Sequence, residues 1–269
     1  MAPCDSFLGW VLPKMNLRPE GYRKVRKQVC QRMKKRIKEL GLQGFGDYRA
    51  HLENNPHEWE ILDKMTRITI SRFFRDRKAW EELGDRLIPK ITRRANTLRR
   101  PVRCWTAGCA SGEEPYSLSI LWKEKILPSF PDAHLEIIAT DADPNMLDRA
   151  RQACYTKGSL REVPPEWIKK AFYRKIHFYC LKDPYRQRVS FHLQDIRKTM
   201  PEGTFDLVFC KNLTAMYFSR ELATRIFKRI SERMEKGAYL VLGNHEEIHL
   251  ESIQEIRLFD KGINIYRKE

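Results

Sequence analysis

Apolar residues recur at helical spacing through the first hundred positions of the chain. Between Pro19 and Gly41 the apolar positions are spaced by four and then by three, at Val25, Val29, Met33, Ile37 and Leu40. This pattern predicts one amphipathic helix that ends at the glycine. Similar patterns predict helices over 45–53, 56–65 and 76–87. We therefore predict an all-α N-terminal domain over residues 1–75 and a linking helix over 76–100.

The pattern changes after Pro101, where short β-prone runs alternate with helical segments. The predicted strands are 102–107, 135–140, 189–193, 205–210, 238–243 and 263–266, and the predicted helices are 114–127, 145–153, 165–171 and 219–234. Such alternation is typical of parallel βαβ units. Residues 101–269 are thus predicted to form an α/β domain with a Rossmann-like doubly wound sheet, which binds ligands at the carboxyl ends of its strands.

The charge of the chain is strongly positive and unevenly distributed. The net charge is +16, and residues 1–100 carry 24 Lys and Arg against 12 Asp and Glu, whereas residues 101–269 carry 27 against 23. The excess therefore lies mainly in the predicted helical domain. It predicts an acidic partner for that domain, and charge alone leaves a nucleic acid, an anionic membrane and an acidic protein open.

Composition and sequence pattern indicate the class of protein and the compartment in which we expect it. Hydrophobic residues make up 42% and charged residues 32% of the chain, which is typical of a globular protein. No apolar run reaches the roughly 20 residues of a membrane helix, and the N-terminus lacks an export pattern, so we expect a cytoplasmic protein without membrane insertion. Seven cysteines without a Cys-x-x-Cys pair argue against a disulfide framework and a zinc site. His245 has no partner at ligand spacing, so no metal is expected.

A glycine-containing loop follows the first predicted strand. Gly108 and Gly112 allow a tight turn and a close approach of a ligand, and Glu113, Glu114 and Pro115 open the next helix. The loop has neither the G-x-G-x-x-G spacing of dinucleotide sites nor the Gly-Lys-Ser/Thr of a P-loop, and its two acidic residues would repel a pyrophosphate. It therefore favours a ligand with a cationic centre.

The second predicted strand ends in Asp141-Ala-Asp143. In nucleoside-binding α/β folds a carboxylate about 20 to 30 residues after the glycine loop binds the ribose hydroxyls. A ribose carboxylate, a loop suited to a cationic centre and the lack of a phosphate motif together predict S-adenosylmethionine as the ligand. The alternative interpretation is two ordinary strand-end turns with solvated acids.

Three stretches of the chain resemble the CheR-type methyltransferases. They are Trp105-Thr-Ala-Gly-Cys-Ala-Ser-Gly-Glu-Glu-Pro-Tyr-Ser117, Ala139-Thr-Asp-Ala-Asp143 and Phe205-Asp-Leu-Val-Phe-Cys-Lys-Asn212. Phe73-Phe-Arg75-Asp76 and Gly243-Asn-His-Glu-Glu247 extend the resemblance to nearly the whole chain. It implies a class I methyltransferase fold that uses S-adenosylmethionine, releases S-adenosylhomocysteine and methylates glutamate side chains of chemotaxis receptors.

The resemblance also implies roles for individual residues. Arg75 and Tyr217 are implied as catalytic residues at the methyl acceptor, where Arg75 holds the carboxylate and Tyr217 orients it. The residues implied around the cofactor are Thr69, Ser71, Arg75, Ala107, Gly108, Glu113, Asp141, Asp195, Ile196, Asn212 and Leu213. Within this set Glu113 matches the acid at the amino-acid end of the cofactor, Asp141 the ribose acid, and Asp195 and Ile196 the pair beside the adenine.

Three departures from the family pattern concern these roles. One extra residue precedes Tyr217 in Asn212-Leu-Thr-Ala-Met-Tyr217, and Thr69 replaces an amide that contacts the cofactor. Residues 173–188 lack the Gly-x-Gly that similar proteins carry in a small β-subdomain. Docking of a receptor's C-terminal peptide at that place is therefore not expected.

These observations lead to one expected function and two alternatives. We expect a monomer that binds S-adenosylmethionine between its two domains and methylates a glutamate of an acidic protein, such as a chemoreceptor helix bundle, docked on the basic N-terminal helix. Nucleic acid is not the expected partner. The alternatives are a methyltransferase that acts on RNA or a small molecule, and a regulatory module that binds S-adenosylmethionine without turnover.

Overall fold

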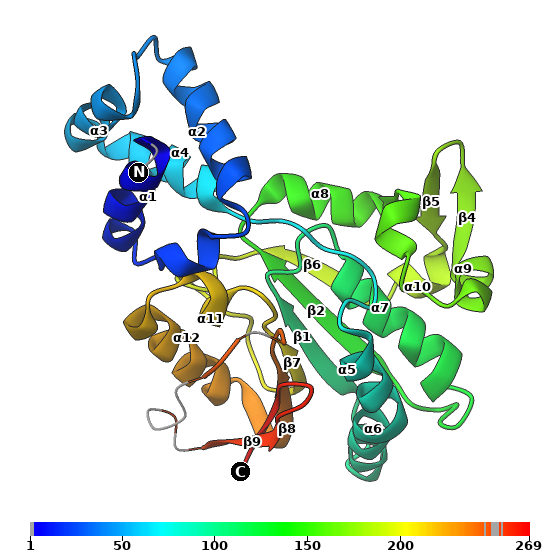
Figure 1. The fold of residues 1–269 in the computed structure, drawn as a ribbon. Coiled ribbons are helices and arrows are strands. Elements are labelled where there is room, and N and C mark those ends of the chain that lie inside the picture. The colour runs from blue at the N-terminus through cyan, green and yellow to red at the C-terminus, as the bar shows by residue number, and fades with distance from the viewer. Residues whose placement is uncertain (1–2, 245, 249–252, 254) are drawn as a thin grey trace. The chain divides into compact units, whose positions relative to one another are not determined.

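The computed structural model describes residues 3–244, 246–248, 253 and 255–269. The chain forms two compact units, of which the first joins residues 1–68 to 213–223 and the second joins residues 69–212 to 224–269. We call them the N-terminal unit and the sheet unit (Figure 1). The domain boundaries placed at 75 and 100 from the sequence stay a prediction. No helix in the described part of the chain is long and apolar enough to cross a membrane.

The N-terminal unit is helical, as the sequence predicts. Its elements are α1 (Pro3–Lys14), the 3-10 turn η1 (Pro19–Tyr22), α2 (Arg26–Glu39), α3 (Phe45–Asn54), α4 (Pro56–Thr66) and the short α11 (Thr214–Tyr217). The predicted helix over 19–41 is divided into η1 and α2, because Val25 leaves the helical conformation with ψ near 1°. Gly41 has a φ of +70° just beyond the end of α2, and this left-handed conformation favours glycine at a helix terminus.

The core of this unit contains a buried ion pair. Val29, Met33 and Ile37 form the buried face of α2. On the adjoining face Arg36 donates to both carboxylate oxygens of Glu58 at 3.0 and 2.7 Å, and the Tyr48 hydroxyl donates to the same carboxylate at 2.8 Å. These bonds outweigh the burial and hold the pKa of Glu58 below its usual value.

Two disulfides correct the expectation that the cysteines remain free. Cys4 of α1 pairs with Cys30 of α2, and Cys154 pairs with Cys180. Both pairs are 26 residues apart in the sequence, so no short-range spacing signals them. The other three cysteines, Cys104, Cys109 and Cys210, are buried.

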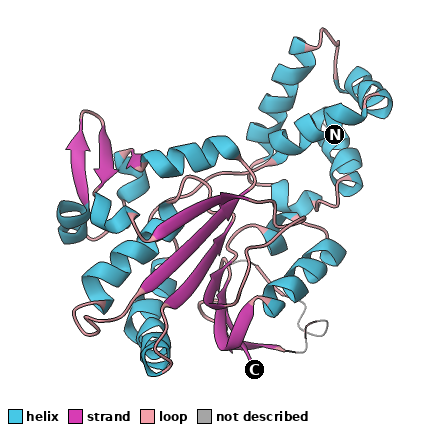
Figure 2. Ribbon diagram, turned by 180° about the vertical axis from the view of Figure 1, so that it is seen from behind, coloured by secondary structure: helices cyan, strands magenta, loops and turns pink. Residues whose placement is uncertain are grey.

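The sheet unit is built on a seven-stranded mixed sheet (Figure 2). Its strands are β1 (Val102–Ala107), β2 (Leu135–Asp141), β6 (Val189–Leu193), β7 (Phe205–Phe209), β8 (Met234–Val241), β9 (Ile256–Asp260) and β10 (Ile265–Lys268). Their order is β6-β2-β1-β7-β8-β10-β9, in which the first five are parallel and β10 is antiparallel to both neighbours. The prediction of a doubly wound sheet is confirmed, with β1 at the point where the order reverses.

Helices cover both faces of this sheet. They are α5 (Arg77–Glu82), the π-helical turn η2 (Leu83–Leu87), α6 (Ile88–Thr97), α7 (Glu113–Leu121), the π-helical turn η3 (Trp122–Ile126), α8 (Pro144–Gln152), the 3-10 turn η4 (Lys157–Leu160), α9 (Pro165–Ala171), α10 (Asp183–Arg186) and α12 (Arg220–Glu232). Figure 1 shows α5, α6 and α7 on one side of the sheet and α12 on the other. Trp80, Leu83 and Ile91 lie in the same buried cluster as Cys104, Ile137 and Leu207.

A small antiparallel sheet is attached to this unit. It consists of β3 (Cys154–Tyr155), β5 (Phe178–Leu181) and β4 (Phe172–Lys175), with β5 in the middle. The Cys154–Cys180 disulfide joins two residues that lie opposite each other on β3 and β5. The segment forms a hairpin although it lacks the Gly-x-Gly of similar proteins. Tyr173, Ile176 and Phe178 are exposed on it.

Candidate functional site

The candidate site begins where β1 and β2 end side by side. Gly108 and Cys109, which follow β1, both donate their backbone N–H to the carbonyl oxygen of Thr140, at 2.8 and 3.0 Å. The next residue, Ala110, donates its N–H to Asp141 Oδ2 at 2.8 Å. The Asp141 carboxylate therefore fixes the loop after β1. Its other oxygen accepts the N–H of Asp143 at 2.9 Å, so the carboxylate has a defined orientation at the carboxyl edge of the sheet.

Gly112 allows the loop to turn directly into α7. Its φ is +89°, and a Cβ built on it would lie 3.0 Å from the Cβ of Ala150 on α8. A side chain at this position would meet both backbone strain and a steric clash. The glycine thus permits the loop, α7 and α8 to approach closely, which is what a loop that passes over a nucleoside requires.

Glu113 is a buried carboxylate at the start of α7. It is 3% exposed and accepts a hydrogen bond from Ser111 Oγ at 2.9 Å. Burial raises the pKa of Glu113, while hydrogen bonds from Ser111 and Ser71 and the charge of Arg149 oppose that rise. The structure thus brings Ser71 and Glu113 together. A cationic group placed beside this carboxylate would favour its ionised form, so the position suits the ammonium end of an amino acid.

The segment 69–76 brings Arg75 to the end of β7. Phe74 donates its N–H to Ser117 Oγ of α7 at 2.9 Å, and Phe73 is fully buried against Tyr155, at 4.8 Å between ring centroids. With the segment anchored in this way, Arg75 Nη2 donates to Asn212 Oδ1 at 3.1 Å. Asp76 follows Arg75 directly in the sequence, but within the described residues no ion pair joins the two.

Asp76 pairs with Lys211 instead, a residue that the sequence analysis did not single out. Lys211 Nζ lies 3.0 Å from Asp76 Oδ2 and donates to the carbonyl oxygen of Arg75 at 2.9 Å. Its side chain is 4% exposed. Lys211 therefore holds the backbone of segment 69–76 against the end of β7. The sequence feature that could have indicated Lys211 is its place directly before Asn212 in the family motif that ends β7.

Glu246 is a second residue without a predicted role. Its carboxylate accepts the backbone N–H of Asn212 and, at 2.8 Å, that of Gly243. Asn212 has a φ of +54°, and a Cβ on Gly243 would lie 2.9 Å from the Asn212 side chain. Glu246 and Gly243 thereby fix the backbone conformation that presents the Asn212 amide to Arg75. His245, between them in the sequence, lies outside the described residues.

Glu114, next to Glu113, has a pKa far above its ordinary value. Burial raises its pKa to about 7, and the nearby charges of Lys211 and Arg75 lower it less than burial raises it. Glu114 is thus largely protonated below neutral pH. It adds little negative charge near Arg75 under mildly acidic conditions.

For the other residues that are predicted to contact the cofactor, the structure gives mainly their position and burial. Ala107 is buried at the end of β1 and Thr69 is half-buried at the start of the sheet unit. Ile196 is buried after β6, and beside it both oxygens of Asp195 accept bonds from the Arg197 guanidinium at 2.6 to 3.0 Å. Because the Asp195 carboxylate already accepts hydrogen bonds from Arg197, an adenine would have to bind to it alongside that guanidinium.

Leu213 and Tyr217 belong to the N-terminal unit and are described with it. Leu213 accepts the backbone N–H of Tyr217 at 3.0 Å in the turn of α11. The ring of Tyr217 packs on that of Tyr22 at 5.1 Å between centroids, and its carbonyl accepts the N–H of Arg18 at 2.9 Å. The roles of Leu213 and Tyr217 at cofactor and acceptor stay predictions.

Comparison with known proteins agrees with this geometry. The sequence model described as CheR methyltransferase, SAM binding domain, matches residues 69–261. The chain belongs to the CheR methyltransferase family. As a member of this family it is an S-adenosylmethionine-dependent methyltransferase. The chemistry of the residues present fits that cofactor, because Asp141 is a carboxylate of fixed orientation, Gly112 allows a tight turn and Glu113 is a buried acid.

Relatives of this CheR-type methyltransferase match it over most of their lengths. A probable chemotaxis protein methyltransferase of Rhizobium etli is 30% identical over 249 residues, which are 89% of this chain and 90% of the relative. Chemotaxis protein methyltransferase 1 of Pseudomonas aeruginosa is 32% identical and matched over 82% of each chain. The chemotaxis protein methyltransferase of Listeria innocua is 30% identical over 76% of this chain and 75% of its own.

Solved structures with a similar fold are more distant. Monomeric WbdD is 14% identical, with a TM-score of 0.42 over 76% of this chain and 46% of its own. The N-methyltransferase NodS of Bradyrhizobium japonicum, in complex with S-adenosylhomocysteine, is 16% identical, with a TM-score of 0.31 over 59% of this chain and 61% of its own.

Proposed function

We propose that this CheR-type methyltransferase transfers the methyl group to a glutamate side-chain carboxylate of an acidic protein of the chemoreceptor class, in the cytoplasm. The observation that carries the proposal is the state of Arg75. Its guanidinium is held by the Asn212 amide at 3.1 Å, and among the described residues no carboxylate forms an ion pair with it. A positive charge fixed by a neutral partner is suited to hold an acceptor carboxylate.

The chemistry requires little beyond positioning. When bound, S-adenosylmethionine supplies a methyl group on a sulfonium. With the cofactor bound, an oxygen of the ionised acceptor glutamate would attack the methyl carbon, so that a C–O bond would form as the C–S bond breaks and the electron pair would pass to sulfur. No proton moves, because the glutamate is already ionised at neutral pH. Arg75 orients the carboxylate, and alignment of this kind contributes up to about 7–11 kcal/mol in well-oriented systems.

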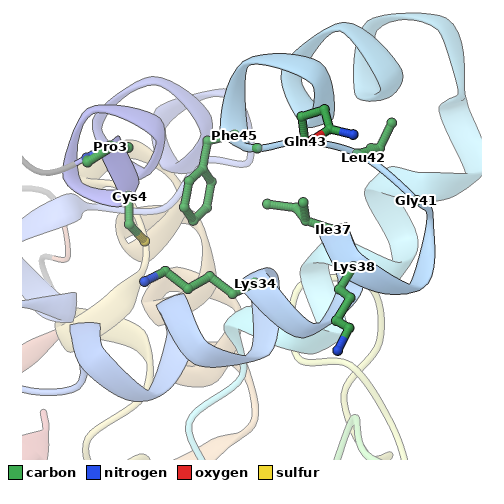
Figure 3. Close-up of a pocket in the computed structure, with 10 residues that line it drawn as sticks. Pro3, Cys4, Lys34, Ile37, Lys38, Gly41, Leu42, Gln43 and Phe45 are labelled. Carbon is green, nitrogen blue, oxygen red and sulfur yellow. The ribbon is translucent and has the colours of Figure 1, made fainter.

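The acidic partner is proposed to dock on α2. Lys27, Lys34 and Lys38 are exposed, and among the described residues none of them forms an ion pair. Lys34 and Lys38 also line a 630 Å³ hollow whose apolar lining includes Ile37 and Phe45 (Figure 3). An acidic helix with one apolar side chain complements this surface, since its charge meets the lysines while the side chain enters the hollow.

The function is tested with methyl-labelled S-adenosylmethionine and the cytoplasmic helix bundle of a chemoreceptor as acceptor. We expect label on the protein that mild base releases as methanol, which identifies a carboxyl methyl ester. Base-stable label, or label that goes only to RNA or a small molecule, would refute the glutamate acceptor. Cofactor binding without any transfer would favour the regulatory module.

Matched arginine variants test the role of Arg75 in the same assay. Arg75→Gln removes the charge at the acceptor and should lower kcat/KM by at least about 30-fold, since a hydrogen bond to a charged group contributes about 2 kcal/mol. Arg77→Gln removes an exposed arginine two residues away, which pairs with Glu81 on α5. It should leave turnover unchanged. Equal activity of the two variants would exclude Arg75 from the acceptor site.

Docking on α2 is tested by charge reversal. Changing Lys27, Lys34 and Lys38 together to Glu should raise KM for the receptor fragment and leave the dissociation constant for S-adenosylmethionine unchanged. The control reverses Lys78 and Lys157, which are exposed lysines of the sheet unit. Kinetics that do not change in the α2 variant would rule out this docking surface.

A further inference from the structure

A second cavity lies in the sheet unit, away from the carboxyl ends of the strands. It has a volume of 110 Å³ and is bounded by α6, the start of β7, β8 and β10. Asp206 is the second residue of β7, and the loop that carries the candidate cofactor site follows the opposite end of the parallel strands. The cavity is therefore distinct from the methyl-transfer site, and the inference drawn from it does not depend on the proposed function.

The floor of this cavity contains buried donors without a partner. Tyr239 is 1% exposed, and its hydroxyl has no hydrogen-bond partner among the described residues. The same holds for the buried Nε of Arg267. Tyr239 on β8 and Arg267 on β10 are register partners in the antiparallel pair, so their side chains share one face of the sheet. Both residues line the cavity, and two buried donors there are costly unless an acceptor occupies it.

The walls of the cavity are cationic. Lys90 and Arg94 lie four residues apart on α6 and line it together with Arg267. Arg94 uses one N–H on the carbonyl of Lys236, and in the described part of the chain none of the three cations is in an ion pair. Three unneutralised positive charges around one space attract an anion.

The single carboxylate in the lining is already neutralised. Asp206 accepts two bonds from the Arg100 guanidinium, both at 2.7 Å, and one from the backbone N–H of Arg103 at 3.0 Å. It is 3% exposed. Asp206 thus already accepts three hydrogen bonds, and none of them comes from the Tyr239 hydroxyl or the Arg267 Nε. Donors exceed acceptors within the cavity.

Gly237 keeps the cavity open. It has a φ of +76°, and a Cβ on it would lie 2.9 Å from Arg94 Nη1 and 3.4 Å from Arg267 Nη2. The lack of a side chain at this turn allows two guanidinium groups to converge. The volume of 110 Å³ equals the share of roughly three to four water molecules, which accommodates one tetrahedral oxyanion.

We propose that this cavity is a binding site for a phosphate-type oxyanion, held by Arg94, Arg267, Lys90 and the Tyr239 hydroxyl. The anion accepts hydrogen bonds from the two buried donors that lack a partner, and it neutralises the cations of α6 and β10. Free inorganic phosphate and the phosphate group of a small phosphomonoester share this chemistry. Binding at this site stabilises the packing of α6 on the sheet by mass action.

The experiment is calorimetric titration of the full chain with inorganic phosphate at constant ionic strength, and in parallel with O-phosphoserine. We expect saturable binding of phosphate to the native protein at concentrations up to about 10 mM, with a rise in melting temperature. Binding of both compounds supports a phosphomonoester site, and binding of inorganic phosphate alone supports a site for the free ion. A lack of saturable binding by either would overturn the proposal.

Three variants locate the binding. Tyr239→Phe removes only a hydroxyl that has no hydrogen-bond partner in the described part of the chain, so the fold should stay intact, and phosphate affinity should fall about tenfold. Arg94→Gln should have a similar effect. Arg93→Gln, the control, changes the adjacent exposed arginine of α6, which lies over the ring of Phe130 outside the cavity, and should bind phosphate normally. Native affinity in both Tyr239→Phe and Arg94→Gln would place the anion elsewhere and refute the site.

Discussion

Replacing Asp141 by asparagine is the sharpest test of the cofactor site. The Asp141 carboxylate accepts the backbone N–H of Ala110 at 2.8 Å and that of Asp143 at 2.9 Å, so its orientation is set before a ligand arrives. This carboxylate is proposed to accept the two ribose hydroxyls when the cofactor binds. Asparagine keeps the shape and one acceptor oxygen, but it loses the charge and one acceptor.

The magnitude follows from the bonds that are lost. A hydrogen bond to a charged group contributes about 1.5–3 kcal/mol and a neutral one about 1 kcal/mol. Replacing two charge-assisted bonds to the ribose by one neutral bond should cost about 2–5 kcal/mol. This corresponds to a dissociation constant for S-adenosylmethionine about 30 to 4,000 times higher than that of the native protein.

The assay is calorimetric titration with S-adenosylmethionine and, separately, with S-adenosylhomocysteine. Asp143→Asn is the matched control, because Asp143 caps α8 by accepting the N–H of Asn145 at 2.9 Å and has no proposed ligand contact. We expect Asp143→Asn to bind both compounds normally. An Asp141→Asn protein that melts normally and binds within about threefold of native would refute the ribose role.

Three further outcomes are expected from residues that shape the two units. Glu58→Ala should lower the free energy of unfolding by about 3 kcal/mol in urea titrations, because it leaves the Arg36 charge and the Tyr48 hydroxyl without their shared partner. Gly112→Ala should lower the melting temperature and weaken cofactor binding, since its φ is +89° and Ala150 leaves no room for a methyl group. Glu114 has a pKa of about 7 in the folded protein and 4.5 as its ordinary value, so its contribution to stability is present below pH 4.5 and is lost as the pH rises to 7. Glu114→Gln should therefore be more stable than the native protein at pH 8, by up to about 3 kcal/mol, and should gain nothing at pH 4.

The regular elements of the sheet unit could be predicted because each has one clear hydrophobic period. The predicted strands 102–107 and 189–193 and the predicted helix 165–171 coincide with β1, β6 and α9. Strands β1 and β7 are mostly apolar and are buried along nearly their whole length, which is characteristic of the middle of a parallel sheet. A run that is buried in this way admits few alternative interpretations.

Elements without such a pattern escaped prediction. Helix α1 was missed because Gly9 and Pro13 interrupt its apolar run, although Pro13 falls in its last turn. Strand β9 was missed because Leu258 and Phe259 are both exposed, so the strand shows no alternation. The predicted strand 263–266 is shifted to Ile265–Lys268, since the apolar Ile263 lies in the turn before the strand.

Only those site residues that belong to short sequence motifs could be predicted. Asp141 and Glu113 follow strands whose ends meet at one edge, and that proximity follows from topology. The contact of Arg75 with Asn212 joins residues 137 positions apart, and the bonds of Lys211 to segment 69–76 span a similar distance. Both disulfides likewise depend on tertiary proximity. Such long-range partners have no local signal in a single sequence.

The N-terminal unit is built from two separate segments of the chain. This limits how chimaeras between members of the family can be designed. Leu17 forms a bridge to Phe218, Arg18 donates to the carbonyl of Ala215, and a Cβ on Gly21 would clash with Met216. A chimaera that exchanges only residues 1–68 between two homologues would therefore combine a foreign helical unit with a native 213–223 segment. A graft that is meant to exchange substrate preference should therefore succeed only when both segments are transplanted together. The two segments are separated in the sequence, but they pack as one structural unit.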